Sequence, residues 1–132
     1  MKDISRSLLE SEDGTIGICY AQSHPYVKKN STQYWFGLHD HQVEFLDSRN
    51  QGYLTYHCVD TGLLLVPWNE FKKYLERLGE TLAASYHGHW YHIILEGMHE
   101  GEIYLTPKAP HDRIDMTNYY LVKQVPNPNA TS

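Results

Sequence analysis

Cysteine is scarce in this sequence, which limits cross-links and metal–thiolate sites. Only Cys19 and Cys58 occur in 132 residues, and each lies in a segment that we expect to be a β-strand. In a reducing compartment, such residues are expected to be buried free thiols rather than a disulfide. Their spacing is also too wide for a two-cysteine zinc motif.

Long apolar runs are also missing. No segment reaches the ~18 to 20 apolar residues that a membrane-spanning helix requires. Residues 1–13 carry acidic side chains where a signal peptide would have its apolar segment. The sequence therefore predicts a cytoplasmic protein without a membrane partner.

An excess of basic charge is absent as well. The chain has 11 Lys and Arg against 16 Asp and Glu, a formal net charge of −5. Proteins that bind the phosphate backbone usually have the opposite balance, because Lys and Arg release counterions from the polyanion. Any nucleic-acid surface would depend on a few local cations, and the candidate phosphate contacts are Lys28, Lys29 and Arg49.

The common catalytic signatures do not occur. There is no zinc-protease motif, no GxSxG elbow and no phosphate-binding glycine loop. His57 and Cys58 are neighbours in a predicted strand, so their side chains point to opposite faces and cannot form a base–nucleophile pair. The sequence leaves open whether the protein is an enzyme.

The composition is globular and rich in aromatic residues. Hydrophobic residues make up 41% of the chain, and there are 11 tyrosines. A chain of 132 residues fits one domain with a single core. We expect this domain to cover residues 1–125, with a flexible tail at 126–132.

The segment from Tyr53 to Leu78 indicates how that domain is built. Two β-forming runs, Tyr53–Val59 and Leu63–Val66, flank a short glycine-containing loop typical of a hairpin. Pro67 ends the second run, and apolar side chains at helical spacing follow it. The pattern predicts strand, turn, strand and helix.

The rest of the chain predicts more elements of the same kinds. Further strands are expected at Thr15–Ala21, Gln33–Leu38, His89–Leu95 and Glu102–Thr106, and short helices near residues 3–9 and from Asp40 onward. Residues 22–32 are expected to form a polar loop, 80–88 a linker or helix extension, and 115–121 a helical turn or edge strand. Together these elements predict an α+β domain, with a mostly antiparallel sheet of five or six strands and two or three helices.

Histidines form one candidate site for chemistry. His39 and His41 follow one predicted strand, while His87 and His89 begin another. With the carboxylate of Asp40, these side chains could converge at neighbouring strand ends and hold a divalent metal such as zinc. The alternative is that they are ordinary surface and core residues and that the protein has no cofactor.

Aromatic residues form a second candidate site. Alternation in a strand sends Trp35 to one sheet face and Tyr34 to the other, so one set belongs to the core and the other lines a pocket. Stacking on a single-stranded or flipped base is worth roughly 1–3 kcal/mol per base. The candidate contact aromatics are Tyr34, Trp35, Tyr53, Tyr56 and Trp90. A tyrosine-rich core or a protein-binding patch is the alternative.

Acidic residues do not complete a nuclease site. Metal-dependent nucleases of the restriction-enzyme type place an Asp on one core strand and a Glu-x-Lys pair on the next. Asp60 lies in the predicted hairpin turn, but Leu63–Val66 contains no Glu-x-Lys pair.

The succession YWFGLHDHQVEFL, YLTYHCVDTGLLLVPWNEFKKYL and HWYHIIL resembles small domains of bacterial proteins associated with restriction and modification. The similarity covers roughly Tyr34–Leu121 and consists of spacing and aromatic residues. It implies a role next to DNA, as a reader of modified or foreign DNA or as an accessory part of a nuclease. We therefore expect a non-catalytic nucleic-acid-associated binding module. A metal-dependent hydrolase or nuclease and a protein-interaction or oligomerisation domain are the alternatives.

Overall fold

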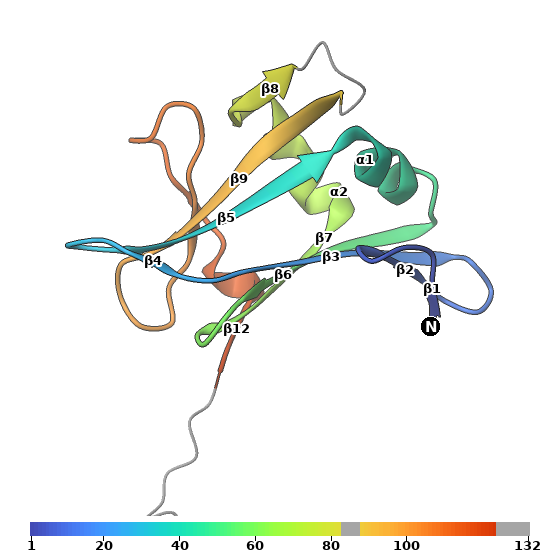
Figure 1. The fold of residues 1–132 in the computed structure, drawn as a ribbon, viewed down its shortest axis with the longest axis horizontal. Coiled ribbons are helices and arrows are strands. Elements are labelled where there is room, and N and C mark those ends of the chain that lie inside the picture. Colours follow the sequence, from blue (N-terminus) through green and yellow to red (C-terminus); the bar gives the residue numbers. More distant parts are fainter. Residues whose placement is uncertain (83–87, 124–132) are drawn as a thin grey trace, which may run out of the picture.

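Two six-stranded β-sheets make up most of the computed structural model, which describes residues 1–82 and 88–123 (Figure 1). Strands account for 47% of the residues and helical segments for 18%. The predicted α+β class is therefore wrong. The described part of the chain is β-rich, with two sheets instead of one and only two short α-helices.

Sheet A has the strand order β1-β2-β3-β6-β7-β12. Its strands are β1 (Lys2–Asp3), β2 (Leu8–Glu10), β3 (Ile16–Ser23), β6 (Gln51–Cys58), β7 (Gly62–Pro67) and β12 (Tyr120–Val122). Strands β3 and β6 pair in parallel, and the other neighbours are antiparallel. The parallel pair arises because the chain leaves sheet A after β3, builds part of sheet B, and returns.

Sheet B has the order β11-β10-β9-β5-β4, and β8 also pairs with β9. Its strands are β4 (Tyr26–Val27), β5 (Thr32–His39), β8 (Glu80–Leu82), β9 (His89–Gly97), β10 (Tyr104–Leu105) and β11 (Ile114–Asp115). The long antiparallel pair of β5 and β9 forms its centre.

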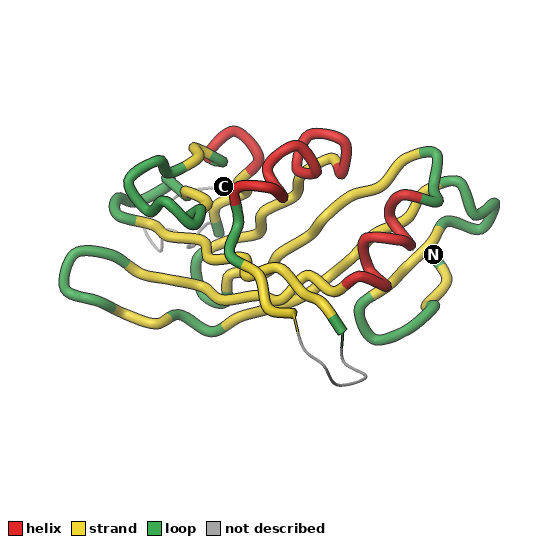
Figure 2. The backbone as a smooth tube through the Cα atoms, turned by 90° about the horizontal axis from the view of Figure 1, so that it is seen from above, coloured by secondary structure: helices red, strands yellow, loops and turns green. Residues whose placement is uncertain are grey.

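Helical structure is confined to short segments, drawn in red in Figure 2. They are α1 (Asp40–Asp47), α2 (Trp68–Phe71) and two 3₁₀ segments, Lys72–Arg77 and Thr117–Tyr119. None of the helices in the described residues is long and apolar enough to cross a membrane.

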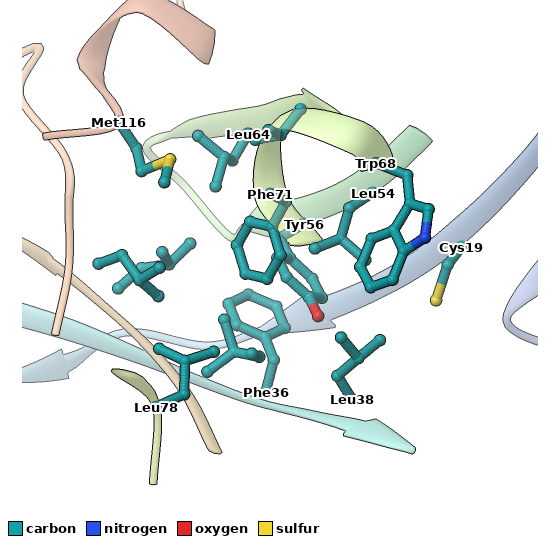
Figure 3. Close-up of a cluster of buried hydrophobic side chains, with 14 of the residues drawn as sticks. Cys19, Phe36, Leu38, Leu54, Tyr56, Leu64, Trp68, Phe71, Leu78 and Met116 are labelled. Carbon is teal, nitrogen blue, oxygen red and sulfur yellow. The ribbon is translucent and has the colours of Figure 1, made fainter. Parts of the chain in front are cut away.

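The core lies between the two sheets (Figure 3). Phe36 of β5 stacks on Tyr56 of β6, with ring centroids 4.2 Å apart. Trp68 and Phe71 of α2 add two more buried rings. Sheet B and α2 thus bury one face of sheet A.

The N-terminal helix predicted near residues 3–9 is a β-hairpin instead. Leu8 pairs with Cys19, and Leu9 pairs with Ile18, so this segment extends sheet A. Leu8 is buried while Leu9 is only half-buried, which is strand alternation. Two leucines in a short segment fit either period, and pairing with β3 favours the strand.

The central segment folds largely as predicted. Strands β6 and β7 form the hairpin, and Asp60 in its turn adopts the left-handed φ of 73°. The helix after Pro67 keeps α geometry for only four residues and continues as a 3₁₀ segment. Strands β4 and β8 occupy parts of the expected loop and linker.

Candidate functional site

Two of the candidate contact aromatics lie in the core. Tyr34 and Tyr56 are each 1% exposed. The hydroxyl of Tyr34 shares a 2.7 Å hydrogen bond with Thr61 Oγ1. Tyr53 lies on a different sheet face, where its neighbours are Ile18 and Pro67. The predicted set of five therefore does not form one pocket.

Trp35 and Trp90 lie on the face of sheet B that points away from sheet A. The Trp35 side chain is 49% exposed, and its indole nitrogen donates to Gln33 Oε1 over 3.3 Å. The register of β5 and β9 places further rings on the same face. We define the sheet B aromatic surface as the outward side chains of the two strands: Trp35, Gly37 and His39 on β5, and Trp90, His92 and Ile94 on β9.

The rings of this surface are in contact at one end. His39 and Trp90 have ring centroids 5.6 Å apart, and His39 and His41 are 5.9 Å apart. His92 is anchored by a 2.6 Å hydrogen bond between its Nε2 and Thr81 Oγ1. The rings of His39 and Trp90 therefore lie on a sheet whose neighbouring side chain, His92, is held by a hydrogen bond. This packing limits the movement of the two rings.

Gly37 interrupts the row of rings. It is exposed, and it lies between Trp35 and His39 on β5. A Cβ at this position would meet His39 Nε2 at 3.5 Å and Trp90 Cδ1 at 3.7 Å, which are ordinary contacts. Successive side chains on one strand face are ~6.7 Å apart. Gly37 thus lets the rings of His39 and Trp90 approach its backbone, and it stays exposed between Trp35 and His39.

The structure brings together two residues of the predicted metal set, Asp40 and His89. His89 Nδ1 lies 2.8 Å from Asp40 Oδ1, and its Nε2 lies 3.2 Å from Glu80 Oε2. The hydrogen bond to Asp40 is the main reason why the pKa of His89 is raised above its ordinary value of 6.5. A protonated ring has no lone pair for a metal, so these contacts favour an ion-pair role for His89.

The other members of that set lie elsewhere. His39 belongs to the aromatic surface, His41 is exposed on α1, and His87 lies outside the described residues. Within residues 1–82 and 88–123, no group of three or more His, Cys, Asp or Glu side chains has an arrangement that could hold a metal ion. Glu80, which sequence reasoning missed, is placed by the pairing of β8 with β9. That pairing has no local sequence signal.

The three predicted phosphate contacts lie in two separate parts of the structure. Lys28 and Lys29 are exposed in the turn between β4 and β5. Arg49 pairs with Glu10 over 2.9 Å, and its guanidinium lies 4.3 Å from the centre of the Phe45 ring. Arg49 is therefore held in a contact that sequence reasoning did not anticipate.

Arg113 is a further cation that was not among the predicted phosphate contacts. Arg113 forms a 2.6 Å ion pair with the buried carboxylate of Glu96, which also accepts a 2.8 Å hydrogen bond from Gln33 Nε2. Glu96 pairs with Gln33 at the β4 end of β5 and β9. Arg113 thus joins Lys28 and Lys29 as a cation near that end of the sheet.

The two cysteines are buried free thiols, as predicted. Burial raises the pKa of each thiol to about 12. A thiol with such a pKa is almost entirely protonated at neutral pH and is a poor nucleophile. Cys19 and Cys58 thus act as core residues.

A hollow of about 330 Å³ lies beside the turn between β6 and β7. Thr61 Oγ1 bonds to the hydroxyls of Tyr34 and Tyr120, at 2.7 and 2.8 Å. Burial raises the pKa of Tyr120 to about 12, so its hydroxyl stays neutral. All three hydroxyls are hydrogen-bonded within the protein, and the hollow is only about as large as the smallest ligand pockets.

No family model, curated protein or solved structure matches this chain.

Proposed function

We propose that this protein is a non-catalytic binding module that holds a nucleic-acid base against the sheet B aromatic surface. The observation that carries the proposal is the position of Trp35. Its large ring stands half exposed on an open sheet face, the same face that carries the contact between His39 and Trp90, with Gly37 between Trp35 and His39. Each base that stacks on such a ring contributes roughly 1–3 kcal/mol to binding.

The charge of the protein favours a ligand that is recognised by its bases. Lys28, Lys29 and Arg113 are the cations near the β4 end of sheet B, and the whole chain carries a net charge of −5. A few phosphate contacts are compatible with this balance, while a long duplex backbone would meet repulsion. We therefore expect a single-stranded segment or a base flipped from a duplex, with a shallow dependence on salt.

The resemblance to restriction- and modification-associated domains adds one feature to this proposal. A reader of modified DNA must discriminate a base from its modified form, and the exposed strand position at Gly37, between Trp35 and His39, is where we expect an added group to lie. We propose modified or foreign DNA as the biological ligand. The packing of the aromatic residues supports a binding role, since Trp35 is exposed and the half-buried rings of His39 and Trp90 lie on the same sheet face.

Fluorescence anisotropy with labelled oligonucleotides tests the proposal. Single strands and duplexes, plain and base-modified, are titrated at two salt concentrations. We expect single strands or base-modified DNA to bind more tightly than plain duplex. Trp35→Ala should weaken binding by about 5- to 150-fold, the equivalent of one stacked base.

The matched control is Leu121→Ala, which truncates an exposed apolar side chain on sheet A. This variant should bind like the wild type. Lack of binding to every oligonucleotide at low salt would reject the proposal. So would equal affinities of the wild type and Trp35→Ala.

A further inference from the structure

A chain of four polar contacts runs along the outward face of sheet B and ends at Trp35. Trp35 Nε1 donates to Gln33 Oε1 over 3.3 Å, and Gln33 Nε2 donates to Glu96 Oε2 over 2.8 Å. Glu96 Oε1 in turn lies 2.6 Å from Nη2 of Arg113. The register of β5 and β9 places Gln33 opposite Glu96, and Trp35 is the next residue on the same face of β5. The exposed indole is therefore linked to a buried carboxylate through one amide.

The two neighbours of Gln33 fix the orientation of its amide. An indole N–H is only a donor, so it must meet the amide oxygen. The carboxylate of Glu96, paired with a guanidinium, is only an acceptor, so it must meet the amide nitrogen. Both contacts demand the same orientation, and a reversed amide would lose both of them. Gln33 thus differs from an ordinary surface glutamine, whose amide is free to turn.

The burial of Glu96 strengthens this arrangement. Glu96 is only 4% exposed, and its Oε2 also accepts a 3.3 Å hydrogen bond from the hydroxyl of Ser31. Loss of a donor would leave part of this buried charge without a partner, which is costly, so the contact with Gln33 is held in place. Gln33 is itself half-buried. Its amide is therefore ordered before any ligand arrives, which favours selective binding.

The amide of Gln33 still has hydrogen-bonding capacity for a ligand. A primary amide has two N–H donors and an oxygen with two lone pairs. Glu96 takes one donor, and Trp35 takes one lone pair. One donor and one lone pair remain, at the edge of the exposed Trp35 ring. A base that stacks on Trp35 with its edge toward Gln33 thus meets a donor and an acceptor.

This pattern favours adenine. The indole of Trp35 has two fused rings, and a purine covers more of it than a pyrimidine does. Adenine has the acceptor N7 next to the donor amino group on N6, and a glutamine amide bonds both atoms of that pair. The same edge of guanine carries two acceptors, N7 and O6, and one of them would face Gln33 Oε1.

We propose that Gln33 is the residue that selects the base on Trp35, and that the selected base is adenine. This inference rests on the proposed base-binding function and names its ligand. Glu96 is a positioning residue, because it acts through the amide of Gln33, and Arg113 balances the charge of Glu96.

Fluorescence anisotropy with the full chain tests the proposal. The labelled probes are thymidine oligonucleotides of equal length whose central base is adenine, guanine, cytosine or thymine. The wild type should bind the adenine probe about 5- to 150-fold more tightly than each of the others, the value of one bidentate pair. Gln33→Ala should bind all four probes with nearly equal affinity. Glu96→Gln should also reduce the preference, because a neutral amide no longer dictates the orientation of Gln33.

The matched control is Gln51→Ala, which truncates an exposed glutamine on β6 of sheet A and should keep the wild-type preference. Thermal unfolding shows whether each variant is folded. Gln33→Met, which keeps the length of the side chain without its amide, replaces Gln33→Ala if that variant is not.

An adenine preference that persists in the folded Gln33 variant would overturn the inference. A wild type that binds all four probes equally would overturn it too. In that case, weaker binding by Trp35→Ala would leave the base-binding function in place without the selection of adenine. Binding of none of the probes would reject both the inference and the proposed function.

Discussion

Phe36 of β5 and Tyr56 of β6 stack on each other with their centroids 4.2 Å apart and their planes inclined by 28°, and this contact joins the two sheets. Tyr56 is 1% exposed, and its hydroxyl has no hydrogen-bond partner among the described residues. Burial raises the pKa of Tyr56 well above its ordinary value. The ring and the hydroxyl of this residue therefore have opposite effects on stability.

Substitution of Tyr56 should separate these two effects. Tyr56→Phe removes an unpaired buried hydroxyl and should leave the free energy of unfolding unchanged or raise it by about 1 kcal/mol. Tyr56→Ala removes the stacked ring and should lower that free energy by about 3–5 kcal/mol. Urea denaturation measures both. A loss of more than about 1 kcal/mol in Tyr56→Phe would show that the hydroxyl is hydrogen-bonded in solution.

Gly37→Ala should affect binding without affecting the fold. A Cβ at Gly37 makes only ordinary contacts, and Ala loses less backbone entropy than Gly on folding, so thermal stability should stay equal or rise. The added side chain covers the backbone beside Trp35 and should reduce oligonucleotide affinity. Anisotropy and thermal unfolding of the same preparation test this. Unchanged affinity would place the ligand away from Gly37.

Gly62→Ala, in contrast, should lower the stability of the fold. A Cβ at Gly62 would lie 2.6 Å from the carbonyl oxygen of Leu121, a backbone atom of the neighbouring strand β12. Because that strand must shift to make room, we expect a loss of about 1–3 kcal/mol in urea denaturation. Wild-type stability in Gly62→Ala would show that β12 moves freely at this point.

The ion pairs of His89 predict a pH-dependent stability. The pKa of His89 is raised above 6.5 in the folded protein, chiefly by its hydrogen bond to Asp40. Its contribution is therefore fully present below pH 6.5 and is lost as the pH rises through the raised value. His89→Gln should lower the melting temperature more at pH 6 than at pH 9. His111→Gln, at an exposed histidine, is the control, and an equal loss at both pH values would contradict the assignment.

Thiol reactivity checks the packing of the core. Cys19 and Cys58 are 1% and 0% exposed, and burial raises the pKa of each to about 12. Neither should react with a disulfide reagent at pH 8 in the native protein, and both should react in denaturant. Fast modification of one thiol in the native state would show that its sheet opens locally.

Local sequence signals were sufficient for the elements with strong periodicity or a clear turn. The hairpin of β6 and β7 has a glycine-containing turn between two apolar runs, and β5 and β9 are dense in β-forming residues. A short helix also follows β5, as predicted, with His39 as its N-cap and Asp40 as its first residue. In each of these segments, the residues that specify the structure are close neighbours in the chain.

Local signals failed where a distant partner specifies the structure. Residues 8–10 form a strand because β3 is available beside them, and β3 pairs in parallel with β6, each residue with one 35 positions further along the chain. The division into two sheets depends on those choices of partner. Hydrophobic periodicity shows which side of a segment is apolar. It does not show which strand lies next to that segment.

The candidate site also combines features that local sequence signals predicted with features that only the packing of the sheets decided. Strand alternation correctly placed Trp35 and Tyr34 on opposite faces, because the side-chain period of a strand is a local property. Which of the two faces is covered depends on the packing of sheet A against sheet B. That packing buries Tyr34, leaves Trp35 exposed on the face that carries the contact between His39 and Trp90, and brings Asp40 and Glu80 to His89. Contacts between residues this far apart in the chain depend on long-range burial, which no short stretch of sequence encodes.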